Sequence, residues 1–91
     1  MSEAVRKRVV ARGRVQNVWF RDTARREAEQ LGLAGSARNR DDGAVEMEIE
    51  GEPTAVERFI GWAHDGPPRA RVDDVEVTDL PPEGATGFRI A

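Results

Sequence analysis

Hydrophobic and polar residues alternate along two stretches of the chain. Between Val5 and Val15, small apolar side chains mark one face, and the other face is dominated by Arg6, Arg8, Arg12 and Arg14. Between Ala44 and Glu50, glutamates alternate with Val45, Met47 and Ile49. A period of two predicts a half-buried strand in each stretch. Because opposite charges on paired strands stabilise a sheet by about 0.2–1 kcal/mol per pair, we expect these strands to be neighbours.

Two other stretches carry the period of an amphipathic helix. From Asp22 to Leu31, apolar residues recur every three or four positions, and Gly32 provides a helix stop. A second helix is predicted from Pro53 to about His64, since proline suits the first helical position. Its apolar stripe consists of Val56, Phe59, Ile60 and Ala63. The sequence Gly66-Pro67-Pro68 ends this helix.

Shorter patterns complete the order of elements. Gly35 to Arg40 is predicted to be a strand, and the hairpin turn Asp41-Asp42-Gly43 joins it to the next one. A fourth strand is expected from Arg71 to Thr78, with Val75 and Val77 facing inward, and a short last strand around Phe88 and Ile90. The predicted fold is a single α+β domain spanning residues 1–91. It is a ferredoxin-like βαββαβ sandwich, an antiparallel sheet with two helices on one face and a short extra C-terminal strand.

Composition and charge narrow the function classes. The 91 residues contain 34% charged residues, carry a net charge of -3 and include no cysteine. The missing cysteines exclude disulfides and thiolate metal sites, and the acidic balance disfavours a dedicated nucleic-acid binder. No apolar run approaches the ~20 residues of a membrane span. We therefore expect a cytoplasmic protein that binds neither membranes nor nucleic acid.

Candidate chemistry lies where the first strand leads into the first helix. A helix N-terminus has unsatisfied N–H groups and a partial positive charge, so an arginine there is unfavourable unless an anion binds. Arg21 stands at this position, after the short loop Gln16–Phe20. The loop amides and the Arg21 guanidinium are together suited to a phosphate group. On this local pattern alone, a solvated Arg21 with no ligand remains an alternative.

Two separated motifs extend this prediction. GRVQNVWFR, residues 13–21, resembles the acylphosphatase pattern G-x-V-Q-G-V-x-F-R. LGLAGSARNRDDGAVE, residues 31–46, resembles that family's L-G-L-x-G-W-V-x-N-x-x-D-G-x-V-E, and the likeness continues to Phe88 and Ile90. The resemblance covers nearly the whole chain and implies the same fold that the periodicity predicts.

The resemblance also implies an activity and its residues. Acylphosphatases hydrolyse the carboxyl–phosphate anhydride of acyl phosphates, small molecules, to a carboxylate and inorganic phosphate without a metal or cofactor. By position, Arg21 corresponds to the phosphate-binding arginine and Asn39 to the asparagine that holds the attacking water. The phosphate-binding loop corresponds to Gln16, Asn17, Val18, Trp19 and Phe20. A monomer is expected.

The chain departs from the family pattern in two places near the expected site. Asn17 replaces a glycine, and if the loop needs a positive φ there, Asn is the ordinary residue that tolerates it best. Ser36-Ala37 replaces a larger Trp-Val pair close to Asn39. These departures motivate a first alternative, a catalytically impaired member that binds phosphate or an acyl phosphate without turnover. Trp19, at a variable position of the motif, is expected either to line the acyl side of the site or to pack.

Other candidate sites have weaker support. An RNA-binding module is a second alternative, but its open sheet face needs stacking aromatics where this chain has Arg and Glu. His64 is expected to be a helix-end residue and not a catalytic one. Asp41, Asp42 and Glu46 resemble a metal cluster in sequence, yet a hairpin turn followed by an outward strand residue is the commoner arrangement.

Overall fold

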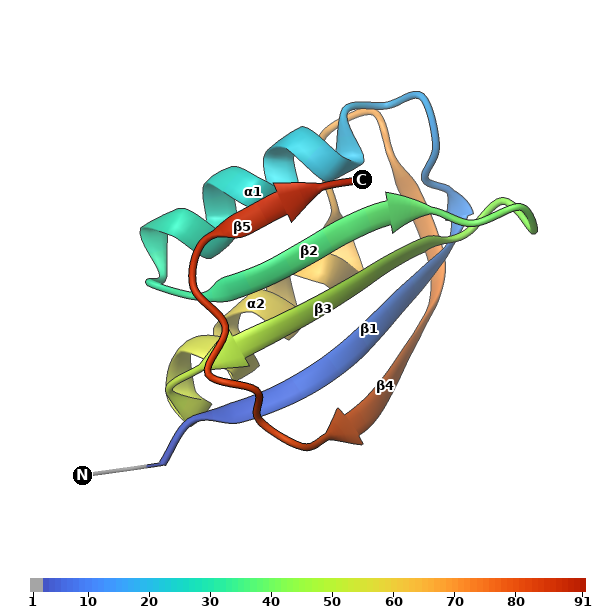
Figure 1. Ribbon diagram of the computed structural model, residues 1–91. Helices are drawn as coiled ribbons and strands as arrows, with labels where there is room; N and C mark the ends of the chain where they lie inside the picture. Colours follow the sequence, from blue (N-terminus) through green and yellow to red (C-terminus); the bar gives the residue numbers. More distant parts are fainter. Residues whose placement is uncertain (1–2) are drawn as a thin grey trace.

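The computed structural model describes residues 3–91 and contains the elements expected from the sequence (Figure 1). Their bounds are β1 Val5–Arg14, α1 Phe20–Gln30, β2 Ala34–Asn39, β3 Val45–Gly51, α2 Pro53–Asp65, β4 Arg71–Leu80 and β5 Phe88–Ile90. No end differs from its predicted position by more than about two residues, as expected for periodicity-based boundaries. Within the described residues, neither helix is long and apolar enough to cross a membrane.

The strands form one sheet in the order β4-β1-β3-β2-β5. β1 pairs antiparallel with β3, so that Arg6 stands opposite Glu50 and Arg8 opposite Glu48. The predicted pairing of the arginine-rich and glutamate-rich strands is therefore confirmed. Arg6 Nη2 lies 2.7 Å from Glu48 Oε1, and Arg8 Nη2 lies 3.4 Å from Glu48 Oε2.

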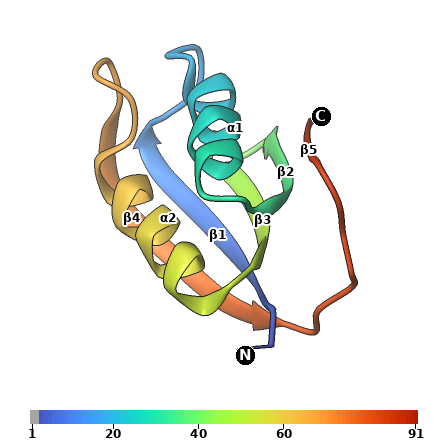
Figure 2. The same ribbon diagram turned by 90° about the vertical axis from the view of Figure 1, so that its left-hand side faces the viewer.

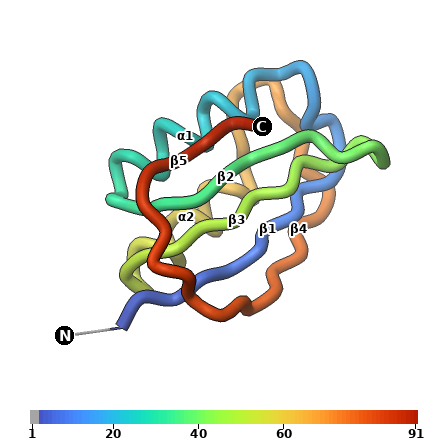
Figure 3. Tube along the Cα trace, viewed as in Figure 1, coloured from blue at the N-terminus to red at the C-terminus, as the bar shows by residue number. Residues whose placement is uncertain are grey.

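The four main strands pair antiparallel as expected, and the extra C-terminal strand departs from this pattern. β5 pairs with β2 in parallel, with Gly35 opposite Phe88 and Ala37 opposite Ile90. The cause is the crossover of residues 81–87, which passes across the ends of the strands to the opposite edge (Figure 3). It therefore enters β5 at the end of the sheet where β2 begins. The sheet is mixed, within a ferredoxin-like α+β fold.

Both helices lie on one face of the sheet, and the core fills the space between (Figure 2). The largest fully buried side chains are Phe20, Phe59, Met47, Ile49, Val9, Val15, Val45 and Val56. They come from the apolar positions of β1 and β3, from the residue that follows β1, and from the apolar sides of the helices. Each contributes about 1.5–3 kcal/mol by leaving water, so the two central strands and the helices are held as one body.

Burial differs from the sequence expectation at two places. Val77 lies opposite the buried Val9 and so faces the side of the helices as expected, but it is 42% exposed, because β4 is an edge strand that α2 covers only in part. Conversely, Arg6 and Glu50 were expected on an open charged face and are both buried. The backbone N–H groups of Glu83 and Gly84, in the crossover, donate to the Glu50 carboxylate and bring the crossover over that end of the face.

A bulge turns the end of β1 toward the following loop. The register with β4 shifts between Arg12 and Gly13, and Gly13 has a φ of 130°. A Cβ at this position would collide with the backbone oxygen of Arg71. Only glycine fits both the conformation and the close approach, so this residue sets the direction in which the chain leaves the sheet.

Candidate active site

The loop between β1 and α1 has a left-handed backbone at two positions. Asn17 has a φ of 62°, which confirms the positive φ expected there, and Trp19 has a φ of 66°. The second value was not expected, because a bulky aromatic residue is uncommon in the left-handed region. When left-handed residues alternate with residues of other conformations, successive backbone N–H groups point to the same side, and this arrangement favours the binding of an anion.

The N-terminus of α1 is open to a ligand. Trp19 is the N-cap residue and its side chain makes no capping hydrogen bond. Among the described residues, no protein acceptor receives a hydrogen bond from the backbone N–H groups of residues 16–22. The first helical bond runs from Thr23 N to Trp19 O at 3.0 Å, and Thr23 Oγ1 donates to the same oxygen at 2.8 Å. Unpaired amides at a helix N-terminus are a favourable environment for phosphate.

Arg21 is held in place by the last residue of the chain. Its Nη1 donates to the backbone carbonyl oxygen of Ala91 at 2.8 Å. Ala91 N in turn donates to Ala37 O at 2.9 Å, which continues the parallel pairing of β5 with β2. The small Ala37, where the family pattern has a larger residue, is fully buried. The guanidinium is therefore positioned through the edge strand, while its remaining N–H groups stay available for a ligand.

A pocket of about 330 Å³ lies between this loop, the start of α1 and the ends of β2 and β5. It is lined by Val15, Asn17, Trp19, Phe20, Arg21, Asp22, Asn39 and Ile90. Asn39 is the last residue of β2 and pairs with Val45 of β3, so its backbone is fixed by the sheet. Arg21 and Asn39, from different elements, thus border one cavity that combines a cation, amide donors and a neutral amide side chain.

Comparison with known proteins identifies the family. A sequence model of the acylphosphatase family matches residues 7–90. The chain belongs to the acylphosphatase family. An acylphosphatase from Rubrobacter xylanophilus is 51% identical over 86 residues, covering 93% of this chain and 78% of that protein. One from Thermococcus kodakarensis is 56% identical over 78 residues, covering 86% of each.

A solved structure agrees with the family assignment and with the fold. The crystal structure of acylphosphatase from Bacillus subtilis matches this chain with a TM-score of 0.93 and 39% identity. The match covers 96% of this chain and 98% of that chain. The architecture described above is therefore the acylphosphatase architecture.

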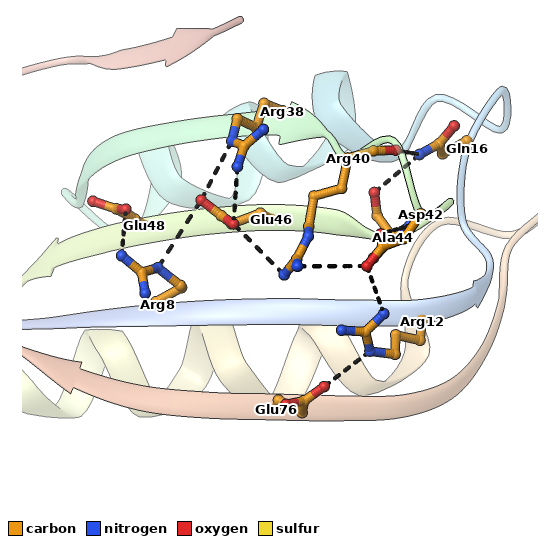
Figure 4. A network of polar contacts seen from close by, with 10 residues as sticks. All are labelled: Arg8, Arg12, Gln16, Arg38, Arg40, Asp42, Ala44, Glu46, Glu48 and Glu76. Carbon is orange, nitrogen blue, oxygen red and sulfur yellow. Dashed lines mark hydrogen bonds and ion pairs between the residues drawn. The ribbon is translucent and has the colours of Figure 1, made fainter.

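Two of the loop residues expected from the acylphosphatase pattern have side chains outside the pocket. The Gln16 side chain donates from Nε2 to Arg40 O at 2.8 Å and to Ala44 O at 3.0 Å (Figure 4). It ties the loop to the β2–β3 hairpin, directly after Asn39. Val18 is buried in the core cluster. Neither residue lines the pocket, so only their backbone N–H groups are candidates for binding an anion there.

Arginines surround the carboxylates of the hairpin (Figure 4). Asp42 Oδ1 accepts from Ala44 N at 3.1 Å, and Asp42 Oδ2 lies 3.1 Å from Arg12 Nη1. The Ala44 N–H first, and then Arg12, lower the pKa of Asp42. Glu46 lies 3.2 Å from Arg38 Nη2. Within residues 3–91 these carboxylates join no group of three or more metal-ligating side chains, and they serve instead to stabilise the turn.

Sequence reasoning missed four residues at the site. Val15, Asp22 and Ile90 line the pocket, and Ala91 positions Arg21. The final F-x-I of the family pattern contains Ile90 and could have indicated that this residue matters. It does not indicate at which edge of the sheet β5 lies. Asp22 has the ordinary place of an acidic residue in a first helical turn, and nothing in its sequence context indicates a pocket.

Proposed function

We propose that this protein hydrolyses acyl phosphates: water attacks phosphorus, the bond from phosphorus to the bridging oxygen breaks, and carboxylate and inorganic phosphate leave. The observation that carries the proposal is the pocket itself. Unpaired amides at the uncapped start of α1, the Arg21 guanidinium and the Asn39 side chain all border one cavity of about 330 Å³. Membership of the acylphosphatase family supports the same reaction.

In this proposal the loop and Arg21 bind the phosphoryl group. The amides of Gln16 to Phe20 donate to a dianion at the positive end of the α1 dipole, and Arg21 supplies a permanent cation. The transition state of phosphoryl transfer spreads charge over the equatorial oxygens. Fixed donors that already face these oxygens stabilise the charge without reorganising, which is the main electrostatic contribution available to the site.

Asn39 holds the attacking water in the same scheme. Its side-chain oxygen accepts one hydrogen of the water and aims the water oxygen at phosphorus. A neutral amide suits this role, because a carboxylate would repel the dianionic substrate. The departing carboxylate is already a good leaving group, and the proton of the water passes to a phosphate oxygen. No strong general base is required.

The division of roles is tested with Arg21→Ala and Asn39→Ala, assayed on benzoyl phosphate with inorganic phosphate as competitive inhibitor. Loss of Arg21 should raise the inhibition constant for phosphate and KM by about 10²-fold, since a charge-assisted contact is lost. Loss of Asn39 should lower kcat by roughly 10²-fold or more and leave phosphate inhibition nearly intact. Arg25→Ala is the matched control, because Arg25 is exposed on the same helix and does not line the pocket.

Equal loss of phosphate inhibition in both variants would contradict these roles. A parent protein that binds phosphate and does not hydrolyse benzoyl phosphate would instead identify an impaired binding member of the family. We further propose that the enzyme acts as a cytoplasmic monomer, which is supported by a site whose described parts all come from one chain and by the absence of cysteine.

A further inference from the structure

A second pocket adjoins the first one across Trp19 and Asp22. Its volume is about 310 Å³, and it lies between the first two turns of α1 and the loop that follows α2. It is lined by Val18, Trp19, Asp22, Thr23, Arg26, Pro67, Pro68 and Arg69. Since Trp19 and Asp22 line both cavities, a molecule whose phosphoryl group occupies the first pocket has the second one beside it. This placement is that of a subsite for the other half of the substrate.

Trp19 forms the ridge between the pockets. Its side chain is 70% exposed, the largest exposure of any large hydrophobic residue in residues 3–91. Its backbone is left-handed, which is unfavourable for a bulky residue. Because the side chain is exposed, burial of the ring does not offset this free energy. The loop geometry places this aromatic face in solvent between two cavities, where it is suited to contact with a ligand.

Two arginines that are not shared with the first pocket line the second one. Arg26, on α1, and Arg69, in the loop after α2, are both exposed and belong to no ion pair within the described part of the chain. Asp22 at the border opposes them in part, but two guanidinium groups outnumber one carboxylate. The remaining wall is apolar and rigid, with the buried Pro67 and Val18. Such a lining suits an acyl group with an apolar middle and an anionic end.

We propose that this second pocket binds the acyl half of the substrate and selects acyl phosphates that carry a second negative group, a carboxylate or a phosphate, at the end remote from the anhydride. The proposal rests on the acyl phosphate hydrolysis proposed above. Arg26 and Arg69 attract the remote anion, and Trp19 contacts the middle of the acyl group. Binding energy from a remote part of the substrate holds the reacting phosphoryl group in position and so raises kcat/KM.

The test compares two substrates that differ by one charge, benzoyl phosphate and 4-carboxybenzoyl phosphate. The wild-type kcat/KM should be higher for the carboxylated substrate, and the neutral 4-carbamoylbenzoyl phosphate should behave like benzoyl phosphate. In the double variant Arg26→Gln/Arg69→Gln, the preference should fall by about tenfold at low salt, since each exposed charge pair contributes modestly. Asp22→Asn should raise the preference. Arg25→Gln, which removes an exposed charge of α1 outside both pockets, should leave the preference unchanged.

Each other outcome overturns the subsite. A wild-type enzyme without preference for the carboxylated substrate would do so, as would a double variant in which the preference persists. A loss of preference in Arg25→Gln equal to that in the double variant would replace the subsite by long-range attraction of the whole surface. An enzyme that hydrolyses none of the three substrates would overturn the proposed function, and this subsite with it. The substrate comparison therefore separates the two failures.

Discussion

Glu50→Gln should destabilise the protein strongly, although Glu50 lies on the sheet face away from the helices. The Glu50 side chain is only 5% exposed and accepts three hydrogen bonds. Arg6 Nη1 donates at 3.0 Å, Glu83 N at 2.9 Å and Gly84 N at 2.8 Å. These bonds join the centre of the sheet to the crossover of residues 81–87, which leads to β5 and so to the carbonyl that positions Arg21.

The expected loss of stability depends on how many of the three hydrogen bonds a glutamine side chain can still accept. With its oxygen at the Oε1 position, glutamine still accepts from Glu83 N and Arg6 Nη1, while its NH2 group faces the Gly84 N–H. The Gly84 N–H then has no acceptor, and the bond from Arg6 loses the carboxylate charge that makes such bonds worth about 1.5–3 kcal/mol. Arg6 retains Glu48 at 2.7 Å, which moderates the cost of an unpaired buried charge. We expect a loss of about 2–3 kcal/mol, or roughly 10–20 °C in Tm for a domain of this size.

The pH dependence gives this prediction a distinct signature. The Glu83 N–H first, then Gly84 N–H and Arg6, lower the pKa of Glu50 in the folded protein below the ordinary value of 4.5. The stabilisation is therefore complete above the unfolded pKa and is lost as the pH falls through the lower folded pKa. The glutamine of the variant does not titrate, so the gap in Tm between wild type and variant should be full near neutral pH and shrink below about pH 4.5.

Thermal unfolding followed by circular dichroism between about pH 3 and pH 7 measures this gap, and amide hydrogen exchange at Glu83 and Gly84 reports the crossover locally. Glu76→Gln is the control, since Glu76 is exposed on β4 and pairs only with Arg12 among the described residues, so its removal should change Tm little. The reasoning is refuted if Glu50→Gln and Glu76→Gln have the same Tm, or if the gap for Glu50→Gln is as wide at acid pH as at neutral pH.

Two further predictions concern the loop of the first pocket. Asn17→Gly should keep or raise the rate of acyl phosphate hydrolysis, because glycine adopts the φ of 62° without strain, whereas Asn17→Val should lose activity and about 1–3 kcal/mol of stability. Assays and thermal unfolding of both variants decide this, and equal behaviour of Gly and Val would mean that position 17 does not need the left-handed region. Gln16→Ala removes the two bonds to Arg40 O and Ala44 O and should cost about 1–3 kcal/mol. It should also lower kcat more than it weakens phosphate binding, because the hairpin next to Asn39 is no longer tied to the loop. An unchanged kcat would show that these two bonds do not position Asn39.

The sequence by itself determined the elements of this protein, because these depend on local patterns. The alternation around Val9 and Met47 predicts strands, and the charges beside it predict the pairing of β1 with β3. Gly32 has the left-handed φ of 71° that suits the predicted helix stop after α1, and Gly43 has a φ of 92° in the predicted hairpin turn. The motifs placed Arg21 and Asn39, which the structure finds at one pocket.

The tertiary structure alone decided how distant parts meet. Glu50 contacts residues more than thirty positions away, and Arg21 bonds to Ala91 across 70 positions. Contacts between residues so far apart produce no periodic pattern in the sequence. The burial of the Glu50 carboxylate and the parallel pairing of β5 were therefore not predicted. The left-handed Trp19 follows from the loop geometry between β1 and α1, not from its own propensity. The pocket with Arg26 and Arg69 exists because α1 and α2 lie on the same face of the sheet, which brings the loop after α2 close to α1.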